Sequence, residues 1–531
     1  MRARAAFLFF LALAVLHTWP LAKAPGTLSL NHNADAELNA WSLSWIAHTL
    51  PRDPLNLFNG NIFEPEQRTL TYTDPLIVPA LASAPIWWLS GSPVLTFNVS
   101  LLIGLALTGW ATWLCARRWT GSDGAALVAG ALAAFNPHLL TRLPHIAAAW
   151  SWTIPLSLYL ADRLIDERRP RTAVWLALTV AITAATSLYS LAFVGIIVAV
   201  VIVAAALRGE WRAARWISGA ALAGLVLASP VLLPYVQFAA TGVSRPIETL
   251  DQFSATIKGY LHSPSRLHGG WSAPFFDRDV SVFFAGLTAI TLAVVGLLVS
   301  VREHSGRRRL MLVALVVVGV VLSLGPATAI YRWLYEWALP LRGLRAAARF
   351  GYLYLIAVAL AAAYGTAWIA SRMRTGWPRH AVVVLALALV TAEAWSAPIH
   401  TRVFTGVPAI YQRLRDMPGP VTLVEMPFYP PETFFENGEY VINSTAHWRP
   451  LMNGYSGYLP DSYRRRTSFF WYFPEARALD RLASEGATHV MVHLERFTPQ
   501  EVIEIERVMR EQTVLTLIAT DSQGHRLYQV R

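Results

Sequence analysis

Long apolar runs separated by short polar loops fill the chain from its N-terminus to about residue 396. A helix needs about 20 mostly apolar residues to cross a bilayer, and the pattern predicts eleven such spans. Their expected ranges are about 5–22, 94–116, 122–138, 147–162, 172–187, 190–207, 216–236, 281–300, 310–327, 350–370 and 380–396. A further apolar segment, 75–90, contains Pro75, Pro79 and Pro85. We expect it to be interfacial or re-entrant and buried against the bundle, because counting it as a span would invert every later loop.

The arginines indicate how these spans are oriented. Every second loop is basic, as at Arg117-Arg118 after the second span and Arg307-Arg308-Arg309 before the ninth. Basic loops tend to stay on the cytoplasmic side. The N-terminus is therefore predicted to be cytoplasmic in the cell inner (plasma) membrane, and the tail extracytoplasmic. The segments expected outside are 23–93, 139–146, 237–280, 328–349 and 397–531.

The first span has a second interpretation. Ala22-Lys23-Ala24 resembles a signal-peptidase site after a short apolar core. Cleavage there would remove the first span and leave every later orientation unchanged. We expect the span to be retained, because it would help to shape a site at Asp35.

The pattern of the polar tail predicts a small α/β domain. Its apolar stretches predict strands at 421–425, 488–493, 515–519 and 526–530, and helical spacing covers 474–484 and 499–512. Pro499 after Thr498 is typical of a first helical turn. The sequence thus predicts two domains, a transmembrane module over 1–396 that includes the outer loop 23–93, and an extracytoplasmic domain over 397–531.

Composition supports a membrane protein and argues against several other classes. Of the 531 residues, 55% are hydrophobic and 15% charged, against about 25% charged in a typical soluble domain. The net charge of +11 comes mainly from loops where topology explains it, so we expect no nucleic-acid partner. A lone cysteine, Cys115, excludes an intramolecular disulfide and a multi-cysteine metal site. The sequence has neither a P-loop nor a Gly-x-Ser-x-Gly elbow, which disfavours an ATP-driven pump and an α/β-hydrolase.

Asp35 and Glu37 follow the first span at the expected outer membrane face. Acids there suit chemistry on a substrate that arrives in the bilayer, so both are candidate catalytic residues. Asp35 would act as general base, or the pair would bind a divalent cation such as Mg²⁺ or Mn²⁺. On a helix the two side chains would diverge by about 200°, whereas in an extended stretch they would share a face. The alternative is a helix start, with Asn33 or Asp35 as cap and Glu37 complementing the helix dipole.

Three arginines, Arg342, Arg345 and Arg349, precede the tenth span in a loop predicted to lie outside. On a helix they would line one face. Their position opposes the positive-inside tendency, so another interaction must favour them. A lipid phosphate is a natural partner, because guanidinium binds phosphate in a bidentate fork. Interfacial snorkelling or pairing with acids of the tail is the alternative.

Other polar groups are weaker candidates for substrate contact. His138, Arg142 and His145 lie in the short outer loop between the third and fourth spans, with no convincing third ligand for zinc. They suit a phosphate or sugar contact, or a purely structural loop. Two polar stretches rich in aromatic residues could stack on a sugar or could simply pack. They hold Lys258, Tyr260, His262, His447, Asn453 and Tyr455.

Together these features resemble the bacterial members of the GT-C superfamily, membrane glycosyltransferases that use polyprenyl-phosphate-linked sugars. The resemblance covers the full length in layout, and its motifs are short. They are Asn33-Ala34-Asp35-Ala36-Glu37, Phe135-Asn136-Pro137-His138, the run Leu341 to Phe350, the long first outer loop and the C-terminal outer domain. Many bacterial members have two acids in the first outer loop, though not always with one residue between them, which leaves the role of Glu37 open.

The resemblance implies a GT-C-like helical fold and transfer of a sugar from polyprenyl phosphate to a glycan, lipid or protein acceptor. Asp35 would serve as base or metal ligand, and Arg345 or Arg349 would hold the lipid phosphate. No cofactor is implied with certainty, since metal dependence varies within the superfamily. A transporter or flippase of a lipid-linked saccharide, or a non-catalytic membrane scaffold, is the competing interpretation. A transporter should show paired half-repeats and charges near the middle of the bilayer, and neither is clear in this sequence.

Overall fold

The computed structural model describes residues 1–242, 246–299, 306–337 and 342–531. Parts of the predicted outer loops 237–280 and 328–349, and the end of the predicted span 281–300, lie outside these residues. The chain divides into two compact units. Unit 1 contains residues 1–23 and 100–400, and unit 2 contains residues 24–99 and 401–531.

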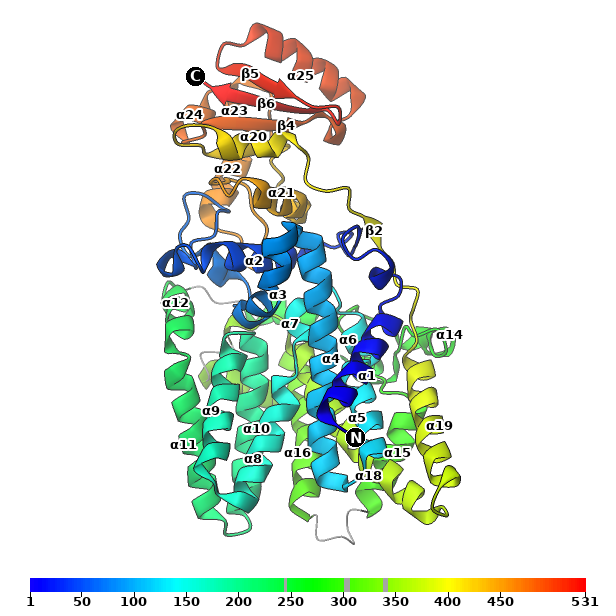
Figure 1. The fold of residues 1–531 in the computed structure, drawn as a ribbon. Helices are drawn as coiled ribbons and strands as arrows, with labels where there is room; N and C mark the ends of the chain where they lie inside the picture. Colours follow the sequence, from blue (N-terminus) through cyan, green and yellow to red (C-terminus); the bar gives the residue numbers. More distant parts are fainter. Residues whose placement is uncertain (243–245, 300–305, 338–341) are drawn as a thin grey trace. The chain divides into compact units, whose positions relative to one another are not determined.

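Unit 1 is helical, and its longer helices run roughly alongside one another (Figure 1). They are α1 (Ala3–His17), α4 (Pro93–Thr120, whose first residues belong to unit 2), α5 (Asp123–Ala134), α8 (Thr153–Glu167), α9 (Pro170–Ala184), α10 (Leu188–Ala206), α11 (Trp211–Leu227), α12 (Ser229–Ala239), α15 (Leu287–Val299), α16 (Gly306–Ser323), α17 (Ala329–Trp337), α18 (Gly351–Arg372) and α19 (Trp377–Ala394). Single α-helical turns lie between them, namely α6 (Pro137–Leu140), α7 (Ile146–Ala149), α13 (Ile247–Leu250) and α14 (Gly269–Ser272). Among the described residues, each of the eleven predicted ranges overlaps an α-helix.

Helix α18 is at the core of this unit and packs against α5, α15 and α16. Glycines let it cross α15 closely. A Cβ on Gly296 would lie 1.9 Å from the carbonyl oxygen of Ala361, and one on Gly365 would lie 2.0 Å from that of Leu292. Small residues at a helix crossing are the usual way in which membrane helices gain van der Waals contact.

Four helices in the described part of the chain are long and apolar enough to cross a membrane, namely α4, α10, α18 with its preceding turn, and α19. The pair α11 and α12, bent by 75°, makes a fifth if it counts as one span. Several other helices are apolar but shorter, including α1, α5, α9 and α15. The structure therefore has the helices of a membrane protein, and the number of crossings stays a prediction.

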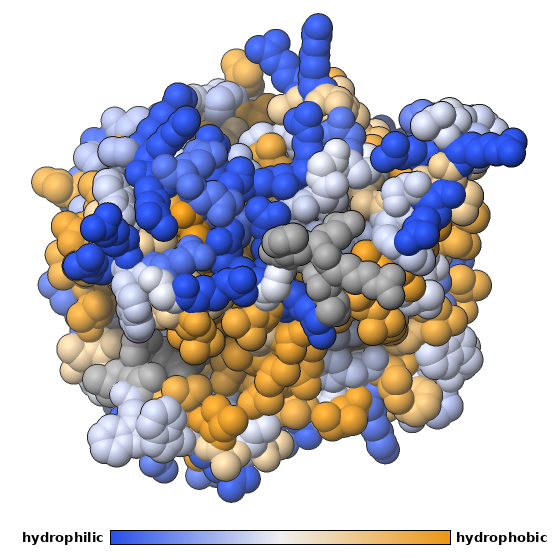
Figure 2. Space-filling view, turned by 90° about the horizontal axis from the view of Figure 1, so that it is seen from below, coloured by the Kyte–Doolittle hydropathy of each residue, from blue (hydrophilic) through white to orange (hydrophobic). Residues whose placement is uncertain are grey.

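Charged side chains meet at one end of unit 1. Asp162, near the end of α8, is fully buried and accepts hydrogen bonds from Trp119, Arg307 and Arg308 at 2.9 to 3.1 Å. Arg118 pairs with Asp166 at 2.8 Å. The ends of α4 and α8 and the start of α16 thus lie together, as the alternation of basic loops predicts. Hydrophilic side chains cover a large part of this end, which Figure 2 shows from below.

Unit 2 combines helices with a four-stranded sheet. Its sheet has the order β3-β4-β6-β5, with β3 parallel to β4 and the other pairs antiparallel. Its main elements are β1 (Leu28–Ser29), α2 (Ala34–Thr49), α3 (Ile77–Ser90), β2 (Arg402–Val403), α20 (Ile410–Asp416), β3 (Leu423–Met426), α21 (Gly438–Asn443), α22 (Asp461–Phe470), α23 (Ala476–Leu479), α24 (Arg481–Ser484), β4 (His489–His493), α25 (Pro499–Glu511), β5 (Leu515–Thr520) and β6 (His525–Val530). The four predicted strands are all present, and Thr498 and Glu501 form a capping box at the start of α25.

The loop 24–99 is grouped differently from the predicted domains. It clusters with residues 401–531, whereas the sequence suggested one module with the transmembrane helices. The reason is backbone pairing. Leu28 is paired with Val403, and Leu451 bridges both Ile62 and Leu423. The apolar segment 75–90, expected to be interfacial or re-entrant, forms helix α3, which packs on α2 in this unit.

Candidate active site

Asp35 lies in the first turn of α2, on the second residue of the helix. Asn33 caps this helix, and its Oδ1 accepts a hydrogen bond from the backbone N–H of Asp35 at 2.9 Å. The Asp35 side chain is half-buried, and its Oδ1 accepts a hydrogen bond from the phenol of Tyr455 at 3.0 Å. The structure thus brings together two predicted site residues that are 420 positions apart. This carboxylate is oriented by a neighbour and favoured by the helix dipole.

Glu37 is in a different environment from Asp35. Its side chain is buried, and its Oε2 would be 2.3 Å from a Cβ on Gly438, so the carboxyl group packs closely against the start of α21. Burial raises the pKa of Glu37 to about 8, and repulsion from Glu439 adds to this, while Arg402 and Arg496 oppose it. Glu37 is therefore mostly protonated at neutral pH, which is a poor state for a base.

The raised pKa of Glu37 predicts a pH-dependent effect of Glu37→Gln on stability. A carboxyl group whose pKa rises from 4.5 to about 8 on folding stabilises the fold below pH 4.5. That contribution is lost as the pH rises through 8. Glutamine carries no such proton, so the variant should match the wild type at about pH 4 and exceed it by a few kcal/mol at about pH 8.5. Thermal unfolding in detergent at both pH values measures this, with the exposed Glu511→Gln as control. A difference that does not change with pH would contradict the expectation.

Asp35 and Glu37 do not fit a shared metal site. Both lie on one helix, two residues apart, and their side chains diverge by about 200°. The structure thus selects the helical alternative, with Asn33 as the cap. The helix also separates an oriented Asp35 from a buried Glu37, so we assign no step to a cation held by this pair.

Four basic side chains line one pocket in unit 1. They are His138, Arg142, His145 and Arg349, and none of the described residues around the pocket is acidic. The start of α10 contributes Ser187, Tyr189 and Ser190 to the same wall. A helix N-terminus and two guanidinium groups both favour an anion. The pocket brings together polar groups that the sequence placed in two separate loops.

Arg349 and His138 are positioned by aromatic neighbours. The guanidinium of Arg349 lies over the ring of Tyr189, 4.3 Å from its centroid, and the Tyr189 hydroxyl accepts a 2.7 Å hydrogen bond from the backbone N–H of Ala346. The ring of His138 stacks on Phe283 at 4.4 Å. Its Nδ1 is buried and has no hydrogen-bond partner among the described residues.

Arg342 and Arg345 do not line the pocket. Residues 342–350 form short turns, with a 3₁₀ turn at Ala347–Phe350, and not one helix on which the three arginines would share a face. Arg342 donates to the backbone carbonyls of Tyr335 and Glu336. Arg345 is exposed and lies over Phe253 at 3.9 Å. The three arginines therefore do not share a helical face, and Arg349 is the member that lines the basic pocket.

The weaker candidates fall into two groups. Lys258 is exposed, whereas Tyr260 bonds Ser323 and His262 is buried with Nδ1 3.2 Å from the carbonyl of Ser272. In the tail, Asn453 is fully buried and bridges strand β3 to Asn437. His447 is buried beside Tyr411, and burial lowers its pKa to about 3. Apart from the exposed Lys258, these residues make the contacts of packed side chains. Tyr455 differs from them, because its phenol donates a hydrogen bond to Asp35.

Sequence reasoning missed several groups beside the predicted ones. Ser187, Tyr189 and Tyr352 line the basic pocket, and Arg496 lies close enough to Glu37 to lower its pKa. Ser187 ends the predicted apolar span 172–187, and Tyr189 follows it two residues later. Polar residues at the outer end of a span were the signal that could have found them.

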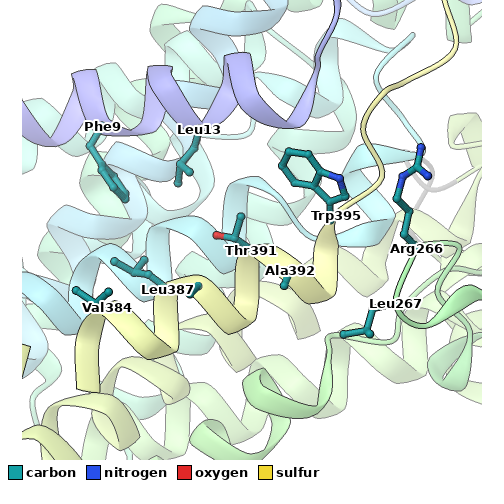
Figure 3. A pocket seen from close by; sticks show the side chains of 10 residues that line it. Phe9, Leu13, Arg266, Leu267, Val384, Leu387, Thr391, Ala392 and Trp395 are labelled. Carbon is teal, nitrogen blue, oxygen red and sulfur yellow. The ribbon is translucent and has the colours of Figure 1, made fainter. Parts of the chain in front are cut away.

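A roomier cavity of about 720 Å³ lies between α1 and α19 (Figure 3). Phe9 and Leu13 face it from α1, and Val384, Leu387 and Trp395 from the region of α19. Arg266 is the single charged residue among those that line it, and its Nε donates to the carbonyl of Ala397. This lining suits a hydrocarbon chain, and its described residues include no carboxylate or histidine.

The comparisons with known proteins identify the family. A domain of unknown function, DUF6311, matches residues 5–392, so the chain belongs to this family. No curated protein matches the chain in sequence. Three solved structures are similar to it in fold at low identity. An Archaeoglobus fulgidus oligosaccharyltransferase tethered to an acceptor peptide is 13% identical, with 100% of this chain and 74% of that one covered and a TM-score of 0.48.

The other two are crystal structures of ArnT from Cupriavidus metallidurans. The form bound to undecaprenyl phosphate is 11% identical, with 98% of this chain and 97% of that one covered and a TM-score of 0.48. The apo form is 13% identical, with 92% and 93% covered and a TM-score of 0.38.

Proposed function

We propose that this protein is an integral-membrane glycosyltransferase. It moves a sugar from a polyprenyl-phosphate donor to a hydroxyl of a glycan, lipid or protein acceptor on the extracytoplasmic side. The basic pocket of unit 1 carries this proposal, because Arg142, Arg349, His138 and His145 meet there without an acid among the described lining residues. A lipid-linked sugar donor has a phosphate ester next to a hydrocarbon chain, and a basic pocket beside apolar helices suits both parts.

The pocket would hold the leaving group of the reaction. When the bond between the anomeric carbon and the phosphate oxygen breaks, negative charge grows on the phosphate. Arg349 and Arg142 would stabilise that charge. Their guanidinium groups are already in place before the reaction, so no solvent has to reorganise as the charge develops. Because the lipid phosphate itself leaves, no nucleotide is needed.

Asp35 would act as the general base. It takes the proton of the acceptor hydroxyl while the acceptor oxygen attacks the anomeric carbon, and the phosphate leaves with the bonding electrons of the broken bond. Direct displacement inverts the anomeric centre. The phenol of Tyr455 orients the carboxylate, and positioning of this kind compensates for the modest basicity of an ordinary aspartate. Glu37, being buried, would support the start of α2 and not touch substrate.

The proposed setting is the cell inner membrane. The eleven predicted spans would cross it, with the N-terminus in the cytoplasm and the tail outside, as the arginine pattern predicts. Asp35, in the first outer loop, would then be on the extracytoplasmic side.

A transfer assay tests this function. Purified protein in lipid is incubated with a panel of polyprenyl-phosphate sugars, and released polyprenyl phosphate is measured with and without candidate acceptors. Release that depends on the protein supports the transferase. Protein-dependent movement of the intact lipid-linked sugar across a vesicle membrane, with no release, would instead indicate a flippase. Neither release nor movement with any donor would favour a scaffold.

A further inference from the structure

A histidine and glutamate cluster in the sheet of unit 2 has no part in the proposed transfer. His493 ends β4 and stands opposite His525, which starts β6, in the antiparallel register. Glu495 follows two residues after His493, in a short 3₁₀ turn at Leu494–Arg496. One nitrogen from each ring and one carboxylate oxygen all lie within 4.8 Å of one another.

The contacts between Glu495 and the two histidine rings are longer than the contacts that the rings make with their outer carboxylates. Oε1 of Glu495 is 3.4 Å from His493 Nδ1 and 3.4 Å from His525 Nε2. In a tetrahedral site with metal–ligand bonds of about 2.0–2.1 Å, neighbouring ligand atoms are separated by about 3.3 Å. The two inner contacts therefore have the length of tetrahedral edges around a metal and exceed the usual length of a charge-assisted hydrogen bond, about 2.7–2.9 Å.

Each ring is held from its far side by a second carboxylate. His493 Nε2 is 2.6 Å from Glu425 Oε2, and His525 Nδ1 is 2.7 Å from Asp521 Oδ2. Histidines that bind a metal almost always make this outer contact, which fixes the ring and raises its basicity. Tyr411 donates a further hydrogen bond to Glu425, so the outer carboxylate is itself positioned.

Access and charge also suit a cation. Both rings are buried, while the Glu495 side chain is 41% exposed, so an ion can enter from that side and keep a water as fourth ligand. The carboxylates of Glu425, Glu495 and Asp521 surround the two histidine rings, and their negative charge favours a cation. Arg496 Nε lies 3.8 Å from Glu495 Oε1, but its two terminal nitrogens are engaged by Tyr429 and Glu439.

We propose that His493, Glu495 and His525 form a zinc site, with Glu425 and Asp521 as its outer carboxylates. Two imidazoles and one carboxylate are a ligand set that zinc uses. The ion would link the end of β4, the turn after it and the start of β6, and would stabilise this end of the sheet. We expect its occupancy to be independent of sugar transfer, since none of these side chains is among the described residues that line the basic pocket.

Zinc binding by the full chain tests the site. Tag-free protein in detergent is stripped with chelator, and zinc chloride is titrated by calorimetry, with metal content measured after desalting. We expect one zinc per chain. Glu495→Gln and His525→Gln should each weaken binding at least about tenfold. Asp521→Asn should weaken it by about 10- to 100-fold without removing a ligand, which a cluster of simple ion pairs would not do.

Two controls separate the site from general effects. His489→Gln removes another buried histidine of β4, and Glu511→Gln removes an exposed carboxylate, and both should bind zinc as the wild type does. Because Glu495 is partly exposed, its variant should fold, which its unfolding temperature without metal can verify. No zinc bound by folded wild type would overturn the proposal, as would equal binding by wild type and the folded Glu495→Gln.

Discussion

Replacing Asp35 with asparagine is expected to slow sugar transfer by about 10²- to 10⁴-fold, the usual contribution of a positioned general base. Asparagine has the same shape, and its Oδ1 can still accept the hydrogen bond from Tyr455. The cap of α2 uses the backbone of residue 35, not its side chain. The loss should therefore fall on kcat, with KM for the donor nearly unchanged. Initial rates of polyprenyl phosphate release at varied donor concentration measure both parameters.

Two further variants show whether the effect belongs to the carboxylate of Asp35. Asp461→Asn changes an acid whose side chain is 98% exposed in the same unit and should leave the rate unchanged. Tyr455→Phe keeps the carboxylate and removes the hydrogen bond that orients it, so its loss should be smaller than that of Asp35→Asn. An Asp35→Asn enzyme with wild-type kcat would remove Asp35 from the mechanism and leave the enzyme class intact.

Arg349→Ala is expected to lower kcat/KM for the lipid-linked donor by about 10- to 100-fold. A hydrogen bond to a charged group contributes about 1.5–3 kcal/mol, and each 1.4 kcal/mol is a factor of ten. Arg349→Lys should fall between alanine and wild type, because lysine keeps the charge but not the bidentate fork. Donor-dependent rates measure this, together with direct binding of polyprenyl phosphate.

The same segment supplies a matched control for Arg349. Arg345 is four residues away, is exposed over Phe253 and does not line the pocket. Arg345→Ala removes the same charge from the same segment and should leave donor binding within about twofold of wild type, as surface changes usually do. Equal losses in both variants would mean that net charge near this segment matters, and that the pocket does not hold the phosphate.

The sequence predicted local structure well because that structure follows local physics. Apolar runs near 20 residues gave an α-helix in every predicted range, and alternating or buried apolar stretches gave all four strands of the tail. Pro499 after Thr498 marked the start of α25. Each of these signals depends on residues within one or two turns, so no knowledge of the rest of the chain was needed.

Predictions about the site were less complete, because a site depends on which distant residues meet. Spacing alone could not decide whether Asp35 and Glu37 share a face, and the Asn33 cap decided it by starting a helix there. The three arginines looked equivalent in sequence. The turns over residues 342–350 separate them, and Arg349 is held over Tyr189 while Arg345 is not.

Local sequence was sufficient to show that this chain is largely helical and apolar, that its tail forms strands, and that acids and arginines gather in loops between apolar runs. Tertiary structure decided that Arg349 lines one pocket with His138, that Tyr455 orients Asp35, and that His493 stands beside His525. The physical reason is distance along the chain. Hydrophobic periodicity is a local property that neighbours fix, whereas contacts between residues hundreds of positions apart exist only once the helices and strands have packed.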